Sequence, residues 1–151
     1  MRVVRLLVAI VVAWLVAFGV ERTASAKAKL DITSVELTKG AASTKARDKQ
    51  VMTTVRRLAN QAAKHLNFGK KGRVEITLVV KELSLIESDG VLRVSCTLVG
   101  RLKGGGSAKS RLSFGGKPDK KKQLERQVLT SVTDGVMTRL AMLARDREAG
   151  S

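Results

Sequence analysis

One stretch of the sequence, KGGGSAKSRLSFGGKPDKKK at positions 103–122, holds the residue types that bind phosphate: five glycines, six lysines and one arginine. Glycine-rich loops cradle phosphates where they follow a strand and open a helix. The pattern G-x-x-x-x-G-K-[ST] fails here, because aligning its last pair with positions 109–110 puts Lys103 and Ala108 where glycines belong. The pattern G-x-G-x-x-G, started from Gly104, ends on a lysine, and the following SRLSF is typical of a strand. The sequence therefore argues against a nucleotide-binding loop.

Lysines crowd the predicted start of the last helix, around Pro118. Four of them fall within positions 117–122, where the helix dipole favours acids, and only Asp119 satisfies that preference. Free backbone N–H groups beside these lysines would hold a phosphate or carboxylate. The alternative is a solvated charge run in a basic protein. The predicted anion-binding set adds three bases to this cluster: Lys109 and Arg111 from the last predicted strand, and Lys103 just before the glycines. The full set is Lys103, Lys109, Arg111, Lys117, Lys120, Lys121 and Lys122.

The outward face of the predicted strands forms a second basic surface. Its members are Lys81, Arg93, Arg101, Lys103, Lys109 and Arg111. If this face is open, we expect it to join the glycine turn and the lysine cluster at one end of the domain. Whether the two surfaces are contiguous depends on the strand register.

Residues for catalysis are few. The chain has one histidine, His65, and one cysteine, Cys96, so neither a zinc set nor a Cys-His or Ser-His-Asp arrangement is indicated. We expect His65 at the edge of a helix's apolar face and Cys96 buried in a strand. The remaining acid–base option is a pair of carboxylates from Glu75, Glu82, Glu87, Asp89 or Glu125. We expect a non-catalytic protein without cofactor or metal, with a small secreted hydrolase that uses carboxylates as the alternative.

The first 26 residues have the pattern of a secretory signal peptide. Arg2 and Arg5 precede an uninterrupted apolar run at 6–20, and positions 24–26 read Ala-Ser-Ala, the small-x-small pattern that signal peptidase accepts. As a helix the run spans roughly 22 Å, against about 30 Å of bilayer hydrocarbon. Cleavage after Ala26 is therefore favoured over an uncleaved anchor. We expect an exported protein, periplasmic or extracellular, with no transmembrane segment after cleavage.

A large positive charge narrows the choice of partners. The chain carries 29 Lys and Arg against 13 Asp and Glu, a formal net charge of +16. Such a surplus attracts polyanions. After the leader the aromatic residues are Phe68 and Phe114, which is too few for the stacking platforms of single-stranded nucleic-acid and sugar sites. We expect an envelope protein or an anionic envelope polymer such as lipopolysaccharide as partner, with nucleic acid disfavoured. The alternative is that the charge serves solubility alone.

Hydrophobic periodicity predicts one domain over residues 27–147, with 148–151 as a frayed end. A period of two predicts strands at 29–38, 73–87, 91–103 and 108–116. A period near 3.6 predicts one helix that starts at Ser43 or Asp48 and ends near Asn67, and another over 118–147. The order β-α-β-β-β-α predicts an α+β fold in two layers, with an antiparallel β-meander and two helices on one face.

Local signals predict the irregular points of this fold. Asp89-Gly90 tolerates positive φ angles and indicates a tight hairpin turn. A phase shift in the alternation between Val80 and Leu83 predicts a bulge. Gly135 lies inside the last helix, where glycine costs about 1 kcal/mol relative to alanine. This favours either close packing against a neighbouring element or a break at that residue.

The segment VEITLVVKELSLIESDGVLRVSCTLVGRL, followed by a lysine-rich link and LERQVLTSVTDGVMTRLAMLA, resembles a recurring layout of envelope domains. A helix, a strand meander and a closing helix occur in this order in the amino-terminal domain of TolB and in lipoproteins related to the curli-secretion protein CsgG. The resemblance spans residues 30–145 and implies a non-catalytic docking or assembly module. It assigns no residue roles, and this chain has no lipobox cysteine.

Overall fold

A computed structural model of the chain describes residues 27–38, 45–70 and 72–150. The predicted signal peptide and Ser43 lie outside the described residues. The elements are β1 (Lys29–Leu37), α2 (Lys45–Ala63), β2 (Arg73–Ser88), β3 (Val91–Leu102), β4 (Ser107–Gly116), the 3-10 turn η1 (Pro118–Lys120) and α3 (Lys121–Ala149). The predicted α+β class and the order β-α-β-β-β-α are confirmed. None of the helices in the described ranges is long and apolar enough to cross a bilayer.

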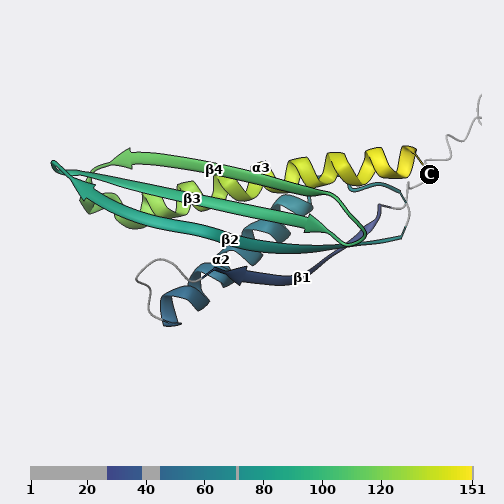
Figure 1. The fold of residues 1–151 in the computed structure, drawn as a ribbon, viewed down its shortest axis with the longest axis horizontal. Helices are drawn as coiled ribbons and strands as arrows, with labels where there is room; N and C mark the ends of the chain where they lie inside the picture. Colours follow the sequence, from purple (N-terminus) through teal and green to yellow (C-terminus); the bar gives the residue numbers. More distant parts are fainter. Residues whose placement is uncertain (1–26, 39–44, 71, 151) are drawn as a thin grey trace, which may run out of the picture.

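The four strands form one sheet in the order β1-β2-β3-β4 (Figure 1). Strands β2, β3 and β4 are the predicted antiparallel meander. Strand β1 pairs with β2 in parallel, so the sheet as a whole is mixed. The reason is the connection: α2 carries the chain back to the end where β1 began, and a strand-helix-strand crossover brings the second strand in parallel to the first.

Both helices pack on the same face of the sheet and form the second layer. In Figure 1 the strands cross in front of α2 and α3. Helix α3 packs against β3 and β4, and α2 packs against β1 and α3. The fully buried side chains between the layers are Val55, Ala59, Ile76, Leu78, Val80, Val94, Cys96, Leu98, Val128, Val132, Thr133, Val136, Met137 and Leu140. The opposite face of the sheet carries neither helix.

The predicted turn and bulge are both confirmed. Asp89 has φ 53° and Gly90 has φ 74°, as a tight two-residue hairpin requires. Along β2 the pairing with β3 shifts by one residue between Val80 and Glu82, which leaves Lys81 as the bulged residue. The bulge lets Val80 and Leu83 both point into the core despite their odd spacing.

Helix α3 is continuous through Gly135, so the glycine does not break the helix, and the prediction of close packing is confirmed. A Cβ atom at position 135 would lie 3.2 Å from Ser110 Oγ, which identifies β4 as the closely packed neighbour. The helix runs to Ala149, two residues beyond the predicted end at Arg147. Helix α2 begins at Lys45, so Asp48 lies within its first turn.

Candidate functional site

The sheet face that the helices leave open is formed by alternate residues of each strand. On β3 and β4 these residues are cross-strand neighbours, and the pairs are Arg93 with Gly115, Ser95 with Ser113, Thr97 with Arg111, Val99 with Lys109, and Arg101 with Ser107. The Ser95 hydroxyl donates to Ser113 Oγ at 2.8 Å. The register is regular over all ten pairs of the β3–β4 ladder. These two strands therefore present a regular surface.

Arg93, Arg101, Lys109 and Arg111 form what we call the basic strip. All four side chains are exposed, and β3 and β4 contain no Asp or Glu. Arg101 is two residues along from Val99, the partner of Lys109, so the two cations are diagonal neighbours about 7 Å apart at the backbone. Arg93, Arg101 and Lys109 form no ion pair with the described residues. The basic strip is therefore a positive surface with no compensating acid on its own strands.

The acids of the open face lie on β1 and β2, and Asp31, Glu75 and Glu82 among them have basic partners. Arg73 pairs with Asp31 across these two strands, and this contact raises the pKa of the guanidinium. Glu82 Oε2 lies 3.7 Å from Arg111 Nη2 and 3.4 Å from the Thr97 hydroxyl. The open face is thus divided into a half on β1 and β2 that carries its acids and a half on β3 and β4 that carries bases only.

The structure separates the predicted basic residues into three places. Lys109 and Arg111 belong to the basic strip, whereas Lys103 lies beyond the far end of β3, beside the glycine turn. The lysine cluster at 117–122 follows the opposite end of β4. Ten residues of extended strand at about 3.4 Å each separate the two by roughly 30 Å. The glycine turn and the lysine cluster therefore lie at opposite ends of the sheet and do not meet at one end.

The start of α3 offers few of the free donors that an anion site needs. Pro118 has no N–H group, the Lys120 amide donates to Lys117 O at 3.0 Å, and the Lys121 amide donates to Pro118 O. These bonds belong to η1, which continues into α3 without a side-chain cap. The cluster at 117–122 therefore contributes positive charge and no preformed cradle of N–H groups.

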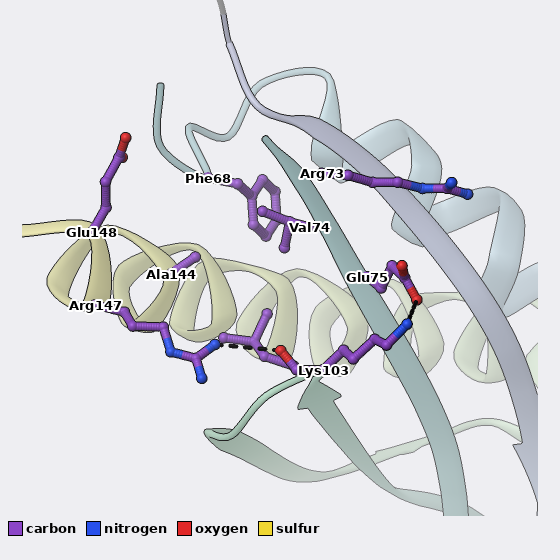
Figure 2. Close-up of a pocket in the computed structure, with 9 residues that line it drawn as sticks. Phe68, Arg73, Val74, Glu75, Lys103, Ala144, Arg147 and Glu148 are labelled. Atoms are coloured by element: carbon purple, nitrogen blue, oxygen red, sulfur yellow. Dashed lines mark hydrogen bonds and ion pairs between the residues drawn. The ribbon is translucent and has the colours of Figure 1, made fainter. Parts of the chain in front are cut away.

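A pocket of about 260 Å³ opens at the other end of the sheet (Figure 2). Its lining consists of Phe68, Arg73, Val74, Glu75, Leu102, Lys103, Ala144, Arg147 and Glu148. Of the predicted anion-binding residues only Lys103 lines this pocket, and Glu75 was expected only as a possible catalytic carboxylate. The remaining members were not predicted because they come from four separate segments, and no spacing along the chain connects them.

The charged groups at the pocket rim hold the surrounding segments together. Lys103 Nζ reaches Glu75 Oε2 at 2.9 Å (Figure 2). The Arg147 guanidinium donates to the carbonyls of Lys103, at 3.3 Å, and Gly104. The Glu148 carboxylate accepts the backbone N–H of Lys70. We interpret this rim as a structural junction between the glycine turn, the loop after α2 and the end of α3.

Three of the carboxylates considered for catalysis are each paired with a different base. Glu125 pairs with Arg47 at 3.3 Å, while Glu75 and Glu82 have the partners given above. His65 is exposed in the turn that follows α2, which corrects its expected place at the apolar edge of that helix. Within the described ranges, no group of three or more His, Cys, Asp and Glu side chains is placed to hold a metal ion.

Cys96 is completely buried in the middle of β3. Burial, and secondarily the negative charge of Glu82, raises the pKa of its thiol to about 12. A thiol with such a pKa is protonated near neutral pH and is a poor nucleophile. The expectation that Cys96 acts as a small buried hydrophobic residue is confirmed for its position.

Comparison with known proteins gives structural neighbours only. No family model and no curated protein matches the chain. Among solved structures, it is similar to the PelC dodecamer from Paraburkholderia phytofirmans (11% identity, 76% of this chain and 93% of that chain, TM-score 0.49). It is also similar to a minor lipoprotein from Acinetobacter baumannii (9% identity, 73% and 93%, TM-score 0.44) and to a putative lipoprotein from Caulobacter crescentus (11% identity, 78% and 92%, TM-score 0.44). Likeness at this level does not determine function.

Proposed function

We propose that this protein is an exported, non-catalytic binding module that docks an anionic envelope partner on the basic strip. One observation carries the proposal. The strip lies on the sheet face that the helices leave open, and three of its four cations have no ion-pair partner among the described residues. Exposed cations without partners have no ion pair within the protein to break when an anion binds, so their positive potential acts on the anion.

The placement of the acids supports binding over a general solubility role. A charge surplus that serves solubility alone does not require acids and bases to be sorted between strands. Helix α3 mixes both signs along its surface, whereas residues 90–118 contain six bases and no acid. These residues include all of β3 and β4. The local concentration of charge on one face favours a specific anionic partner.

A charge-neutralising variant tests the proposal. Arg101→Gln, Lys109→Gln and Arg111→Gln in one protein remove the central cations of the strip and leave the core intact. Salt-dependent retention on immobilised lipopolysaccharide and heparin is measured by the salt concentration at elution. Exposed ionic contacts are worth up to about 1 kcal/mol each, so we expect affinity at about 0.1 M salt to fall roughly tenfold or more.

A matched variant separates the strip from net charge. Arg56→Gln, Arg57→Gln and Lys64→Gln remove the same three charges from exposed positions in and just after α2. This control should keep most of the retention. Equal loss in both variants would show that overall charge binds the polymer and would contradict a site on the strip. No salt-sensitive retention of the unaltered protein, together with no co-purifying acidic partner, would contradict the binding role itself.

A further inference from the structure

We propose that the partner is an extended acidic segment of another protein, which adds to the free edge of β4 as a fifth strand. This inference rests on the proposed function and specifies which anionic partner the basic strip serves. Strand β4 is the last in the sheet, and Figure 1 shows no strand beyond it. A row of unpaired backbone groups at such an edge is a template for strand addition.

The hydrogen-bond pattern identifies which backbone groups of β4 are free. The Leu102 amide donates to Gly106 O at 3.0 Å, so residues 102 and 106 form a hydrogen-bonded pair. In an antiparallel ladder such pairs recur at every second residue. The even-numbered residues of β4 therefore bond β3, and Lys109, Arg111, Ser113 and Gly115 direct their N–H and C=O groups to the free edge.

Arg139 of α3 occupies one end of this edge. Its Nη1 donates to Lys109 O at 2.7 Å, which confirms that this carbonyl points away from β3. No other side chain in the described part of the chain bonds the edge carbonyls or amides of β4. The stretch from Arg111 to Gly115 is therefore open to a strand, while the edge near Lys109 is already capped.

The other edge of the sheet is less suited to strand addition. Strand β1 has a register shift between Ile32 and Ser34, which interrupts its regular spacing. The β3–β4 ladder has no such shift. Bulges on edge strands hinder further pairing, so the sheet is protected at β1 and regular at β4.

The side chains of β4 specify the chemistry of the added strand. The residues whose backbone faces the edge also point their side chains to the open face, and Lys109 and Arg111 are among them. The alternate residues Leu112 and Phe114 face the helix layer and are only partly buried. An added strand that alternates acidic and apolar residues would thus place its acids beside the basic strip and its apolar side chains beside Leu112 and Phe114.

A second copy of this chain does not fit the same edge. Antiparallel pairing of β4 with β4 across a two-fold axis near Arg111 would bring arginine opposite arginine, with lysines close by. Like charges directly opposite on neighbouring strands destabilise the pairing. Charge complementarity therefore favours an acidic strand from a different protein.

Two synthetic peptides distinguish strand addition from charge attraction. One is acetyl-Glu-Val-Glu-Val-Glu-Val-Glu-amide. The other carries N-methyl groups on the glutamate amides, which keeps the charge but removes the donors that face β4 in an antiparallel ladder, because residues that bond each other there point their side chains to the same face. We expect the first to bind the unaltered protein about tenfold tighter, since several backbone hydrogen bonds are lost in the second. Amide exchange measured by NMR should slow about tenfold at Arg111, Ser113 and Gly115 on binding, with Leu112 as the already paired reference. Equal affinity for both peptides, or unchanged exchange at these three amides, would overturn strand addition.

A pair of variants tests the edge from the protein side. Ser113→Pro removes one edge N–H at a position where proline is tolerated, because that N–H does not bond β3. Both variants lose the hydrogen bond from the Ser95 hydroxyl to Ser113 Oγ, but Ser113→Ala keeps the backbone N–H. Only Ser113→Pro should reduce binding of the unmethylated peptide, by about tenfold, and both variants should keep their retention on heparin. Suppose the strip variant loses heparin retention while Ser113→Pro binds the peptide as tightly as the unaltered protein. Strand addition is then contradicted, and the proposed function is still supported. A dimer that forms through β4 without peptide would also overturn the inference.

Discussion

Burial decides the chemistry of Cys96. Cys96 lies on β3 between Leu83 of β2 and Leu112 of β4, and none of its surface reaches solvent. Ionising the thiol there would place a charge in an apolar layer, with Glu82 adding repulsion. The same alternation that predicts its inward position thus explains the high pKa of the thiol, about 12. A single cysteine in this position is a core residue.

This pKa makes the stability of the protein depend on alkaline pH. In the unfolded chain the thiol ionises near 9.0, whereas in the native protein its pKa is about 12. Between these values the unfolded state loses a proton that the native state keeps. The free energy of unfolding therefore falls as pH rises through this window, by about 1.4 kcal/mol per pH unit, and the thiol has no such effect below pH 8.

Urea unfolding of the unaltered protein and of Cys96→Ala measures this contribution. Between pH 8 and 10.5 the unaltered protein should lose about 2 kcal/mol more than the variant. Titration of lysines affects both proteins equally and cancels in the difference. Parallel pH profiles would show that the buried thiol is not linked to folding.

At the scale of elements, the residues that fix local geometry were the most predictable. Asp89-Gly90 and the odd spacing from Val80 to Leu83 each depend on a few adjacent residues, and the turn and the bulge occur where predicted. The parallel pairing of β1 was not predicted. Alternation along β1 identifies a strand but not its neighbour, which depends on the path of the chain through α2.

The packing of α3 on the sheet depends on a glycine in β3. A Cβ atom at Gly100 would lie 2.6 Å from Leu140 Cδ1 and 2.7 Å from Val136 Cγ1, both in the buried interface. Gly100→Ala should therefore force α3 away from β3 and lower the free energy of unfolding by about 1–3 kcal/mol. Thermal or urea unfolding measures the loss.

Gly135→Ala is the matched control on the opposite side of this interface. Its Cβ would lie 3.2 Å from the end of the Ser110 side chain, which can move. The gain in helix propensity, about 1 kcal/mol, offsets the tighter contact, so stability should change by less than about 1 kcal/mol. If both variants lose the same stability, close approach at Gly100 does not control how α3 packs.

At the scale of the whole molecule, the sequence predicted which basic residues face outward but not how these residues group on the surface. The alternation of β3 and β4 correctly placed Arg93, Arg101, Lys109 and Arg111 on the outward face. The sequence did not predict where the lysines at 117–122 lie. The length and direction of β4 put them at the opposite end of the sheet from the glycine turn. The ion pairs of the β2 acids and the contacts at the pocket rim could not be predicted, because the partners in each are distant in sequence.

The end of α3 joins two segments that are far apart in the chain. The Lys70 amide donates to both oxygens of Glu148, at 2.9 and 3.2 Å, across 78 positions of sequence. Gly69 permits this contact, because a Cβ there would lie 2.4 Å from the carboxylate. The Gly69 carbonyl in turn accepts the Ala28 amide at 3.0 Å, just before β1. Glu148 therefore helps to hold the loop after α2 against the start of the sheet.

Removing this carboxylate should loosen one end of the molecule without unfolding the rest. In Glu148→Ala we expect the Lys70 amide to exchange about tenfold faster in NMR measurements, while the core amide of Val94 is unchanged and global stability falls by about 1 kcal/mol. Asp146→Ala removes the same charge from the same helix end but leaves the Lys70 contact in place, so its Lys70 amide should exchange at the original rate. Identical acceleration in both variants would mean that net charge at the end of α3, and not the hydrogen bond to Glu148, keeps this loop in place.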